Sequence, residues 1–186
     1  MRPGGVDRAL ATVREMAIRA PEALLLVGRV GTGKTTVLLA VGDILGERGT
    51  PYALLDLDWL AWASPAPGSG ASVSSLLVAN LVAVTGTFRD AGIERLVLAR
   101  YLRTPTEVDA IRAALGIPVT VVELSAPTAL LQERIRSRDS GRELTEHLAE
   151  LAAGTGTGLG DLVVESGARP VGEIAAEVLA VTGWPA

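Results

Sequence analysis

The segment Gly28-Arg-Val-Gly-Thr-Gly-Lys-Thr35 constrains the fold of this chain more than any other feature. It matches the pattern G-x-x-x-x-G-K-[ST] in full. It follows the short apolar run Ala23–Val27, typical of a buried strand, and it opens an apolar-periodic helix predicted for Lys34–Glu47. Glycines let such a loop turn successive backbone N–H groups toward one anion, and the positive end of the helix dipole points the same way. The motif in this setting predicts a phosphate-binding loop; an ordinary glycine turn before a helix is the alternative.

The chemistry of this loop is that of a nucleoside triphosphate site, and we expect ATP with Mg²⁺. The Lys34 ammonium is expected to reach the β- and γ-phosphates and the Thr35 hydroxyl to bind Mg²⁺. Lys34 is the one lysine beside 16 arginines. Codon bias can explain that surplus of arginine, but a compact ammonium on a flexible stem is what this loop needs. The loop residues predicted to bind the nucleotide are Gly28, Arg29, Val30, Gly31, Thr32, Gly33, Lys34, Thr35 and Thr36.

Short apolar runs alternate with helical patterns along the chain, which predicts an α/β fold with a parallel sheet covered on both faces. The predicted strands are Ala23–Val27, Tyr52–Leu57, Arg95–Tyr101, Pro118–Leu124 and Asp161–Glu165. The predicted helices are Val6–Ala20, Lys34–Glu47, Ser72–Asp90, Thr106–Leu115, Pro127–Arg138, Leu144–Ala153 and Val171–Val181. We expect one domain over residues 1–186, with Ser64–Gly70 as a loop near the substrate and Gly154–Gly160 as a connector rather than a dinucleotide-binding fingerprint.

Composition excludes several classes of partner. The net charge is −4, which disfavours a nucleic-acid partner because nucleic-acid binding needs a basic surface. The chain has no cysteine and one histidine, so disulfides, thiolate metal sites and multi-histidine sites are excluded. The apolar residues come in runs too short to span a membrane, and the N-terminus lacks the apolar run of a signal peptide. We therefore expect a cytoplasmic protein with no membrane partner; the oligomeric state stays open.

Two acids close the second predicted strand. Asp56 and Asp58 are two residues apart, so on a strand they would share a face at the carboxyl edge of the sheet, where open α/β sheets bind ligands. One can hold Mg²⁺ through water and the other can accept a hydroxyl proton, an arrangement suited to phosphoryl transfer to an alcohol. Which acid has which role stays open, with Asp58 favoured as the base; a solvated pair is the alternative. Motor-type ATPases carry an acid at the end of the third strand, and Arg95–Tyr101 has none.

Arginines recur in one helical segment. Arg134, Arg138 and Arg142 fall at i, i+4 and i+8, a spacing at which like charges repel unless an anion lies against them. They would form a lid, over about residues 134–145, that closes on the triphosphate. The alternative is a solvated face neutralised by neighbouring acids such as Asp139.

Other residues are candidates for the acceptor side. Asn80 would either cap a neighbouring loop or reach into an acceptor pocket, because a buried amide needs partners. Arg103 would either hold an anionic acceptor or lie on the surface. Trp59 and Trp62 flank the acid pair and would pack against an acceptor ring or, more ordinarily, against a loop. His147 is expected at the surface.

These residues resemble those of the P-loop small-molecule kinases, and of adenylylsulfate kinase in particular. The similar segments are Gly28–Thr36, Leu55–Asp58 (Leu-Asp-Gly-Asp in that family), Asn80 with Phe88–Gly92, Leu96–Tyr101, Arg134–Arg138 and Asp161–Arg169. The resemblance implies a three-layer P-loop NTPase fold with strand order 2-3-1-4-5. It also implies that Arg134 stacks on adenine, that Arg138 meets the phosphates, and that Arg169 lies on the adenine side.

The chain departs from that family around the acceptor. Leu57 replaces the glycine between the two acids, apolar residues at 81–83 replace arginines, and Ala99–Arg103 replaces a Ser-Pro-Tyr-Arg segment. A related group phosphorylates antibiotics or small hydroxylated metabolites. We expect transfer of the γ-phosphoryl group of ATP to a hydroxyl of a small molecule, with Lys34, Asp58 and Arg138 catalytic.

The remaining assignments complete this hypothesis. Thr35 and Asp56 would bind the metal, and the acceptor would contact Asp56, Asp58, Asn80 and Arg103. Two alternatives are a P-loop ATPase or nucleotide-dependent switch that acts with a protein partner, and a nucleotide-binding module without chemistry.

Overall fold

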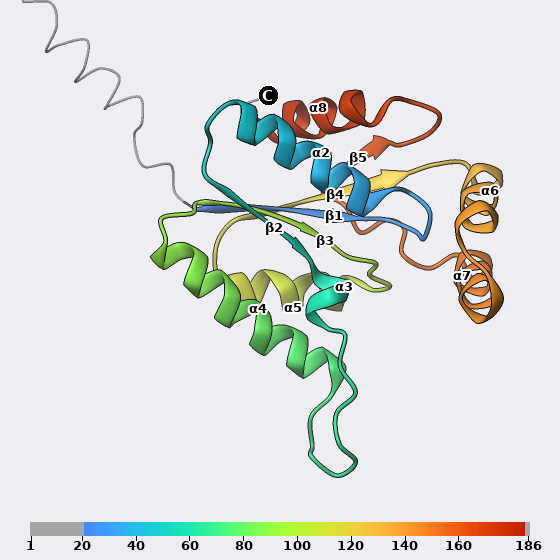
Figure 1. The fold of residues 1–186 in the computed structure, drawn as a ribbon, viewed down its shortest axis with the longest axis horizontal. Coiled ribbons are helices and arrows are strands. Elements are labelled where there is room, and N and C mark those ends of the chain that lie inside the picture. The colour runs from blue at the N-terminus through green and yellow to red at the C-terminus, as the bar shows by residue number, and fades with distance from the viewer. Residues whose placement is uncertain (1–20, 185–186) are drawn as a thin grey trace, which may run out of the picture.

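A computed structural model describes residues 21–184 of the chain (Figure 1). Five strands form one sheet in the order β2-β3-β1-β4-β5, and every neighbouring pair is parallel. The strands are β1 (Glu22–Val27), β2 (Tyr52–Asp56), β3 (Arg95–Ala99), β4 (Val119–Ser125) and β5 (Leu162–Glu165). The predicted fold class and strand order are therefore confirmed.

Helices cover both faces of this sheet (Figure 1). They are α2 (Lys34–Glu47), α3 (Leu57–Leu60), α4 (Val73–Asp90), α5 (Pro105–Leu115), α6 (Thr128–Arg138), α7 (Gly141–Ala153) and α8 (Val171–Thr182). The helix predicted for Val6–Ala20 lies outside the described residues. Within residues 21–184, no helix combines the length and apolarity that crossing a membrane requires.

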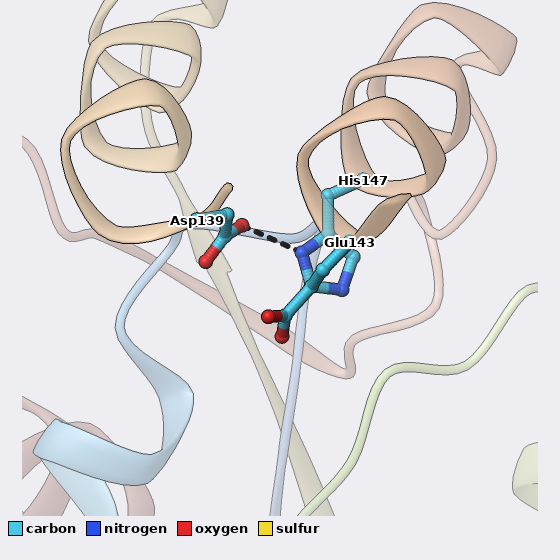
Figure 2. Close-up of side chains that lie close together, drawn as sticks. All are labelled: Asp139, Glu143 and His147. Carbon is cyan, nitrogen blue, oxygen red and sulfur yellow. Dashed lines mark hydrogen bonds and ion pairs between the residues drawn. The ribbon is translucent and has the colours of Figure 1, made fainter. Parts of the chain in front are cut away.

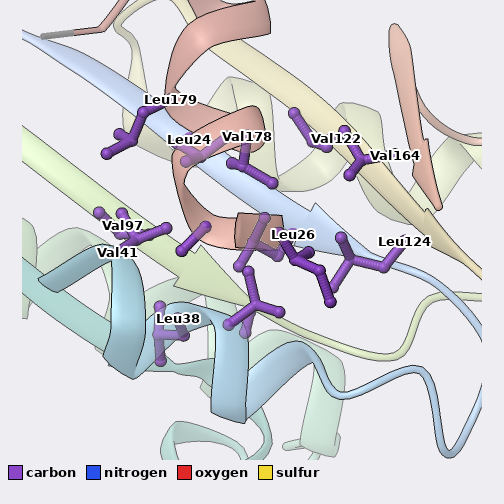
Figure 3. Close-up of a cluster of buried hydrophobic side chains, with 14 of the residues drawn as sticks. Leu24, Leu26, Leu38, Val41, Val97, Val122, Leu124, Val164, Val178 and Leu179 are labelled. Atoms are coloured by element: carbon purple, nitrogen blue, oxygen red, sulfur yellow. The ribbon is translucent and has the colours of Figure 1, made fainter. Parts of the chain in front are cut away.

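Side chains of β1 alternate between two apolar clusters, one on each face of the sheet. Leu24 and Leu26 pack with residues of α2 and α8, as Figure 3 shows, and Leu25 packs on the opposite face with residues of α4 and α5. All three leucines have no exposed surface. A strand that is buried on both faces has a continuous apolar sequence, and this is why β1 could be predicted from the sequence.

The ends of two helices on the α4–α5 face are fixed by capping boxes. Ser72 and Ser75 exchange side-chain-to-backbone hydrogen bonds at the start of α4, and Thr104 and Glu107 do so at the start of α5. Such caps satisfy N–H groups that have no partner inside the helix. They set where each helix leaves the carboxyl edge of the sheet.

The pair of helices α6 and α7 stands at the carboxyl edge of the sheet, beside the P-loop (Figure 1). Val30 of the loop packs with Leu131, Ile135 and Leu151 of these helices in a small apolar cluster of their own. The Arg29 side chain donates to the Thr128 hydroxyl at 3.1 Å and to the Leu151 carbonyl. The α6–α7 pair is thus attached to the P-loop by packing and by hydrogen bonds.

Candidate active site

The backbone of the P-loop depends on glycine at both ends. Gly28 has φ +138°, and a Cβ atom there would lie 2.4 Å from the Leu124 carbonyl oxygen of β4. Gly33 has φ +87° and precedes α2, whose first turn has neither a side-chain cap nor an acidic residue. No side chain of that turn therefore neutralises the positive end of the α2 dipole, which stays available to attract an anion. Thr32, nearly fully buried, donates to the Arg29 carbonyl at 2.9 Å and stiffens the turn.

Lys34 lies folded across the loop. Its Nζ donates to the Gly28 carbonyl at 3.0 Å and to the Arg29 carbonyl at 3.2 Å, and it lies 5.7 Å from the centre of the Tyr101 ring. Withdrawal from water lowers the pKa of Lys34 to about 8, the negative charges of Asp58 and Asp56 oppose this, and the positive charge of Arg138 adds to it. The negative charge of an incoming polyphosphate would favour the ammonium and so offset the cost of its desolvation and of its repulsion from Arg138.

Thr35 and Asp56 connect the start of α2 to the end of β2. The Thr35 hydroxyl donates to Asp56 Oδ2 at 2.8 Å, and Asp56 Oδ1 accepts from the backbone N–H of Asp58 at 3.0 Å. A hydroxyl and a carboxylate are oxygen ligands of the kind that Mg²⁺ prefers. The two residues predicted to bind the metal therefore lie together, 21 positions apart in the chain.

Asp58 is not on a strand, so the prediction that it shares a strand face with Asp56 is wrong. β2 ends at Asp56, which caps the short helix α3, and Asp58 lies inside that helix. Arg100 at the end of β3 approaches Asp58 Oδ1 at 3.8 Å and donates to the Leu57 carbonyl at 2.9 Å. Displacement of water by neighbouring atoms raises the pKa of Asp58 and Arg100 opposes that rise. A carboxylate with a raised pKa is a better proton acceptor than an ordinary one.

Arg138 belongs to a polar cluster around the buried carboxylate of Asp139, one of the acids that the alternative interpretation of the arginine row had named. The Asp139 side chain is only 2% exposed and accepts from Arg138 Nε at 2.6 Å and Nη2 at 3.1 Å. Its other contact is His147 Nδ1 at 2.6 Å (Figure 2). Hydrogen bonds from Arg138 and His147 lower the pKa of Asp139 to about 2. His147, expected at the surface, keeps 26% of its side chain exposed and joins α7 to the end of α6.

Glu143 lies beside the Asp139–His147 pair, so the three side chains could in principle hold a metal ion. Each offers one ligand atom, and these atoms lie within 4.8 Å of one another. Both oxygens of Asp139 already accept hydrogen bonds from Arg138 or His147. The cluster is therefore satisfied as a structural link between the helices.

Arg134 joins the P-loop to the loop after β5. Its guanidinium donates to the Gly31 carbonyl at 3.1 Å, the Ser166 carbonyl at 3.1 Å and the Gly167 carbonyl at 2.7 Å. The adjoining cavity of about 380 Å³ is lined by Gly31, Thr32, Gly33, Thr36, Val37, Arg134, Ser137, Arg138, Ser166, Arg169, Val171 and Ile174. Seven of these were predicted from the sequence. The sequence offered no signal for Ser166, whose contribution is a backbone carbonyl.

Arg142 does not continue the arginine row, and that part of the prediction is wrong. α6 ends at Arg138, and Arg142 lies on α7, where its side chain is 90% exposed and pairs with Glu146. Arg169 lines the cavity and pairs with Glu177 at 2.5 Å.

The candidate acceptor residues contact different elements: Asn80 contacts α3, whereas Arg103 contacts α7. Asn80 is exposed rather than on a buried stripe, and its Nδ2 donates to the Leu60 carbonyl at 3.0 Å, which is the capping role. Arg103 pairs with Glu150 and lies 5.2 Å from the centre of the Tyr101 ring. Trp59 and Trp62 are exposed and stack on each other.

Comparison with known proteins supports this fold. No known family profile matches the sequence. A polyribonucleotide 5′-hydroxyl-kinase of Pyrococcus furiosus is 36% identical over 52 residues, which is 28% of this chain and only 15% of that protein's length.

The similar solved structures are matched over nearly their whole length. The tunicamycin resistance protein of Deinococcus radiodurans has a TM-score of 0.61 at 18% identity, covering 90% of this chain and 98% of that one. The APS kinase of Mycobacterium tuberculosis, in complex with AMPPNP and APS, has a TM-score of 0.58 at 21% identity, covering 88% and 98%. A gluconokinase of Sinorhizobium meliloti 1021 has a TM-score of 0.55 at 22% identity, covering 87% and 91%. At these identities the likeness shows the fold, which is that of P-loop kinases.

Proposed function

We propose that this protein transfers the γ-phosphoryl group of ATP to a hydroxyl group of a small molecule. The observation that carries the proposal is the hydrogen bond between Thr35 and Asp56, because it joins the phosphate-binding loop to a pair of carboxylates at the same edge of the sheet. The position of Asp58, charge-coupled to Lys34 and paired with Arg100, gives that edge a proton acceptor. The fold shared with solved kinases supports the same chemistry.

Each of these residues would have a separate role in an in-line phosphoryl transfer. Loop amides and Lys34 would hold the β- and γ-phosphates, and the guanidinium of Arg138 would add positive charge as the lid closes. Thr35 and Asp56 would hold Mg²⁺, which when bound neutralises charge on the phosphates. Asp58 would take the acceptor's hydroxyl proton as the acceptor oxygen bonds to the γ-phosphorus and the bond to the β-phosphate oxygen breaks. The products are ADP and a phosphate monoester.

The names of the similar proteins point to acceptors of two sizes. The archaeal relative is named for the 5′-hydroxyl of a polyribonucleotide, and the solved structures are named for small molecules. The net charge of −4 favours a small molecule because a polyanion would be repelled. A short oligoribonucleotide with a free 5′-hydroxyl is therefore a comparison substrate in the test below.

The test is an ATP-consumption screen with Mg²⁺ against sugars, sugar acids, nucleosides, adenylylsulfate, hydroxylated antibiotics and that oligoribonucleotide. An acceptor should raise ADP release well above background, and Lys34→Ala and Asp58→Asn should each abolish the rise. Asp109→Asn is the matched control, since Asp109 is an exposed acid on α5. Background hydrolysis that no compound stimulates and that Asp58→Asn leaves intact would instead support a nucleotide-dependent switch.

A further inference from the structure

Two tryptophans stand exposed beside the proposed proton acceptor. The side chains of Trp59 and Trp62 are 69% and 77% exposed, and they are the aromatic members of the large apolar residues exposed within residues 21–184. Their ring centres lie 4.8 Å apart with the planes tilted by 34°. Tryptophan is highly buried on average, so a pair left this open loses much of the stabilisation that burial gives. Trp184, in contrast, is 3% exposed and faces the Arg95 guanidinium.

The backbone that carries the two rings is anchored. Leu57 has no exposed surface, and its carbonyl accepts from Arg100. The Leu60 carbonyl accepts from the Asn80 amide, and Ala61 is buried. Helix α3 is thus tied to the end of β3 and to α4, while the indole rings of Trp59, on α3, and of Trp62, just after it, face water. A rigid support with exposed aromatic faces is the arrangement of a binding site rather than of a loose surface loop.

The position of the rings specifies what they could bind. Trp59 directly follows Asp58 in the chain, and α3 lies at the edge of the sheet that also carries the P-loop (Figure 1). Successive side chains of a helix point about 100° apart, so a compound resting on the rings would have to extend around one turn of α3 to reach Asp58. Indole faces stack on flat rings, and stacking of one nucleobase on an aromatic side chain is worth about 1–3 kcal/mol. Two residues form too small a patch for a stable protein–protein interface, which needs roughly 800 Å² from each partner.

We propose that Trp59 and Trp62 form a stacking platform for the acceptor, and that the acceptor is a hydroxylated compound carrying a planar unsaturated ring, as a nucleoside does. This inference rests on the proposed kinase function and assigns its class of acceptor. The ring stacks on the indoles, and a hydroxyl attached through a saturated linker faces Asp58.

The first test measures ring binding without catalysis. Trp184→Phe leaves Trp59 and Trp62 as the reporters, because the chain has three tryptophans. Uridine, cytidine and hydroxylated phenyl compounds should quench the emission of this variant with saturable curves, and ribose, which keeps the sugar hydroxyls without a ring, should not. Absence of saturable quenching by every ring compound, or equal quenching by ribose, would overturn the proposal.

The second test separates stacking from general apolar contact, using calorimetry or equilibrium dialysis with the best ring compound. Trp59→Leu/Trp62→Leu keeps apolar bulk but removes the flat faces and should weaken binding by about 5- to 150-fold. The double variant Trp59→Phe/Trp62→Phe keeps flat aromatic faces and should retain most of the affinity for the ring compound. Val163→Ala, at an exposed valine on β5, is the matched control and should change nothing. Equal affinities in the leucine and phenylalanine variants would contradict stacking.

The two proposals can fail separately. If a ring-free acceptor is phosphorylated and the KM for that acceptor is unchanged in the leucine variant, the kinase function is supported and the stacking platform is contradicted. If no compound stimulates ATP consumption yet ring compounds bind in a Trp59- and Trp62-dependent way, the platform stands as a binding site and the kinase function falls.

Discussion

The two regions to which we assign the nucleotide and the acceptor, called below the nucleotide half and the acceptor half, are built differently. The nucleotide half comprises the P-loop, the α6–α7 pair and the loop after β5, and Arg134 of α6 contacts the other two parts through three backbone carbonyls. It also has its own apolar cluster around Leu131 and Ile135. The acceptor half comprises α3, the following loop to residue 72 and the start of α4, and its exposed groups include Asp58, Trp59 and Trp62.

The difference matches what each half has to recognise. A triphosphate always presents the same charges, so fixed amides and cations can be arranged in advance to meet it. An acceptor differs from enzyme to enzyme, and specificity resides in side chains grafted on a shared fold. Asp56 is the residue where the halves meet, because its two oxygens accept from Thr35 and from the backbone of Asp58.

Substitution of one charged group in each half should give the largest and most distinct effects. Lys34→Ala should weaken ATP binding and abolish transfer, since it removes a cation from the nucleotide half. Asp58→Asn should lower acceptor-dependent turnover by about 10²- to 10⁴-fold, the usual contribution of a general base, and leave ATP affinity nearly unchanged. The measurements are the Kd for ATP by calorimetry and single-turnover rates with a saturating acceptor.

Asp109→Asn again provides the control for loss of an acidic side chain. A loss of ATP affinity in Asp58→Asn as large as in Lys34→Ala would show that the two halves do not act separately.

A substitution at Asp139 measures how much the buried Asp139 carboxylate stabilises the nucleotide half. Asp139→Ala leaves the Arg138 guanidinium and His147 without their shared acceptor, and breaking such a pair costs about 3–5 kcal/mol when the groups are buried. Arg138 is largely exposed, so we expect the lower end of that range in the free energy of unfolding by urea, with weaker ATP binding. His147→Gln keeps a hydrogen-bonding group and should lose less.

The same cluster predicts that the stability of the fold decreases at acidic pH. The pKa of Asp139 in the folded chain, about 2, is below its ordinary value of 3.8, so its contribution to stability is complete above about pH 4. That contribution should disappear as the pH falls through 2. Equal acid sensitivity of Asp139→Ala and of the unmodified protein would contradict this.

ATP binding should have its own pH dependence from Lys34. The pKa of Lys34 is lowered to about 8, so the ammonium is present below pH 8 and is lost above it. At pH 9 the association constant for Mg-ATP in the free protein should fall by up to about tenfold, and Lys34→Arg, which stays charged, should flatten the profile. A flat profile for the unmodified protein would show that Lys34 keeps its proton.

The sequence predicted β1, the P-loop backbone and α2 because their signals are local. The glycine spacing requires positive φ at Gly28 and Gly33, and the apolar runs are buried on both faces of a parallel sheet. Both ends of α2 followed from these patterns, whereas the strand order followed from the resemblance to P-loop kinases.

The remainder depends on contacts between distant segments, which periodicity does not encode. α3 was missed because its four residues are too few to show a helical pattern. It also follows the strand directly, since Asp56 is both the last residue of β2 and the N-cap of α3. The Asp139–His147 link joins two helices across a turn, and the Ser166 and Gly167 contacts with Arg134 use backbone oxygens that any residue has. Arg142 was misplaced because the i, i+4, i+8 spacing was continued past Arg138, where the predicted helix and α6 both end.

The smallest effect should come from Asn80, whose amide connects the acceptor half to α4. Asn80→Ala removes one hydrogen bond to the Leu60 carbonyl at an exposed site, and such bonds contribute about 0.5–1.5 kcal/mol. Because α3 then loses one anchor, the KM for the acceptor should rise several-fold, while kcat and the KM for ATP stay nearly unchanged. Asn80→Asp keeps the shape but cannot donate to the carbonyl, so it should resemble the alanine variant if the bond matters. A KM that falls only in the alanine variant would mean that Asn80 fills the acceptor's space instead of supporting it.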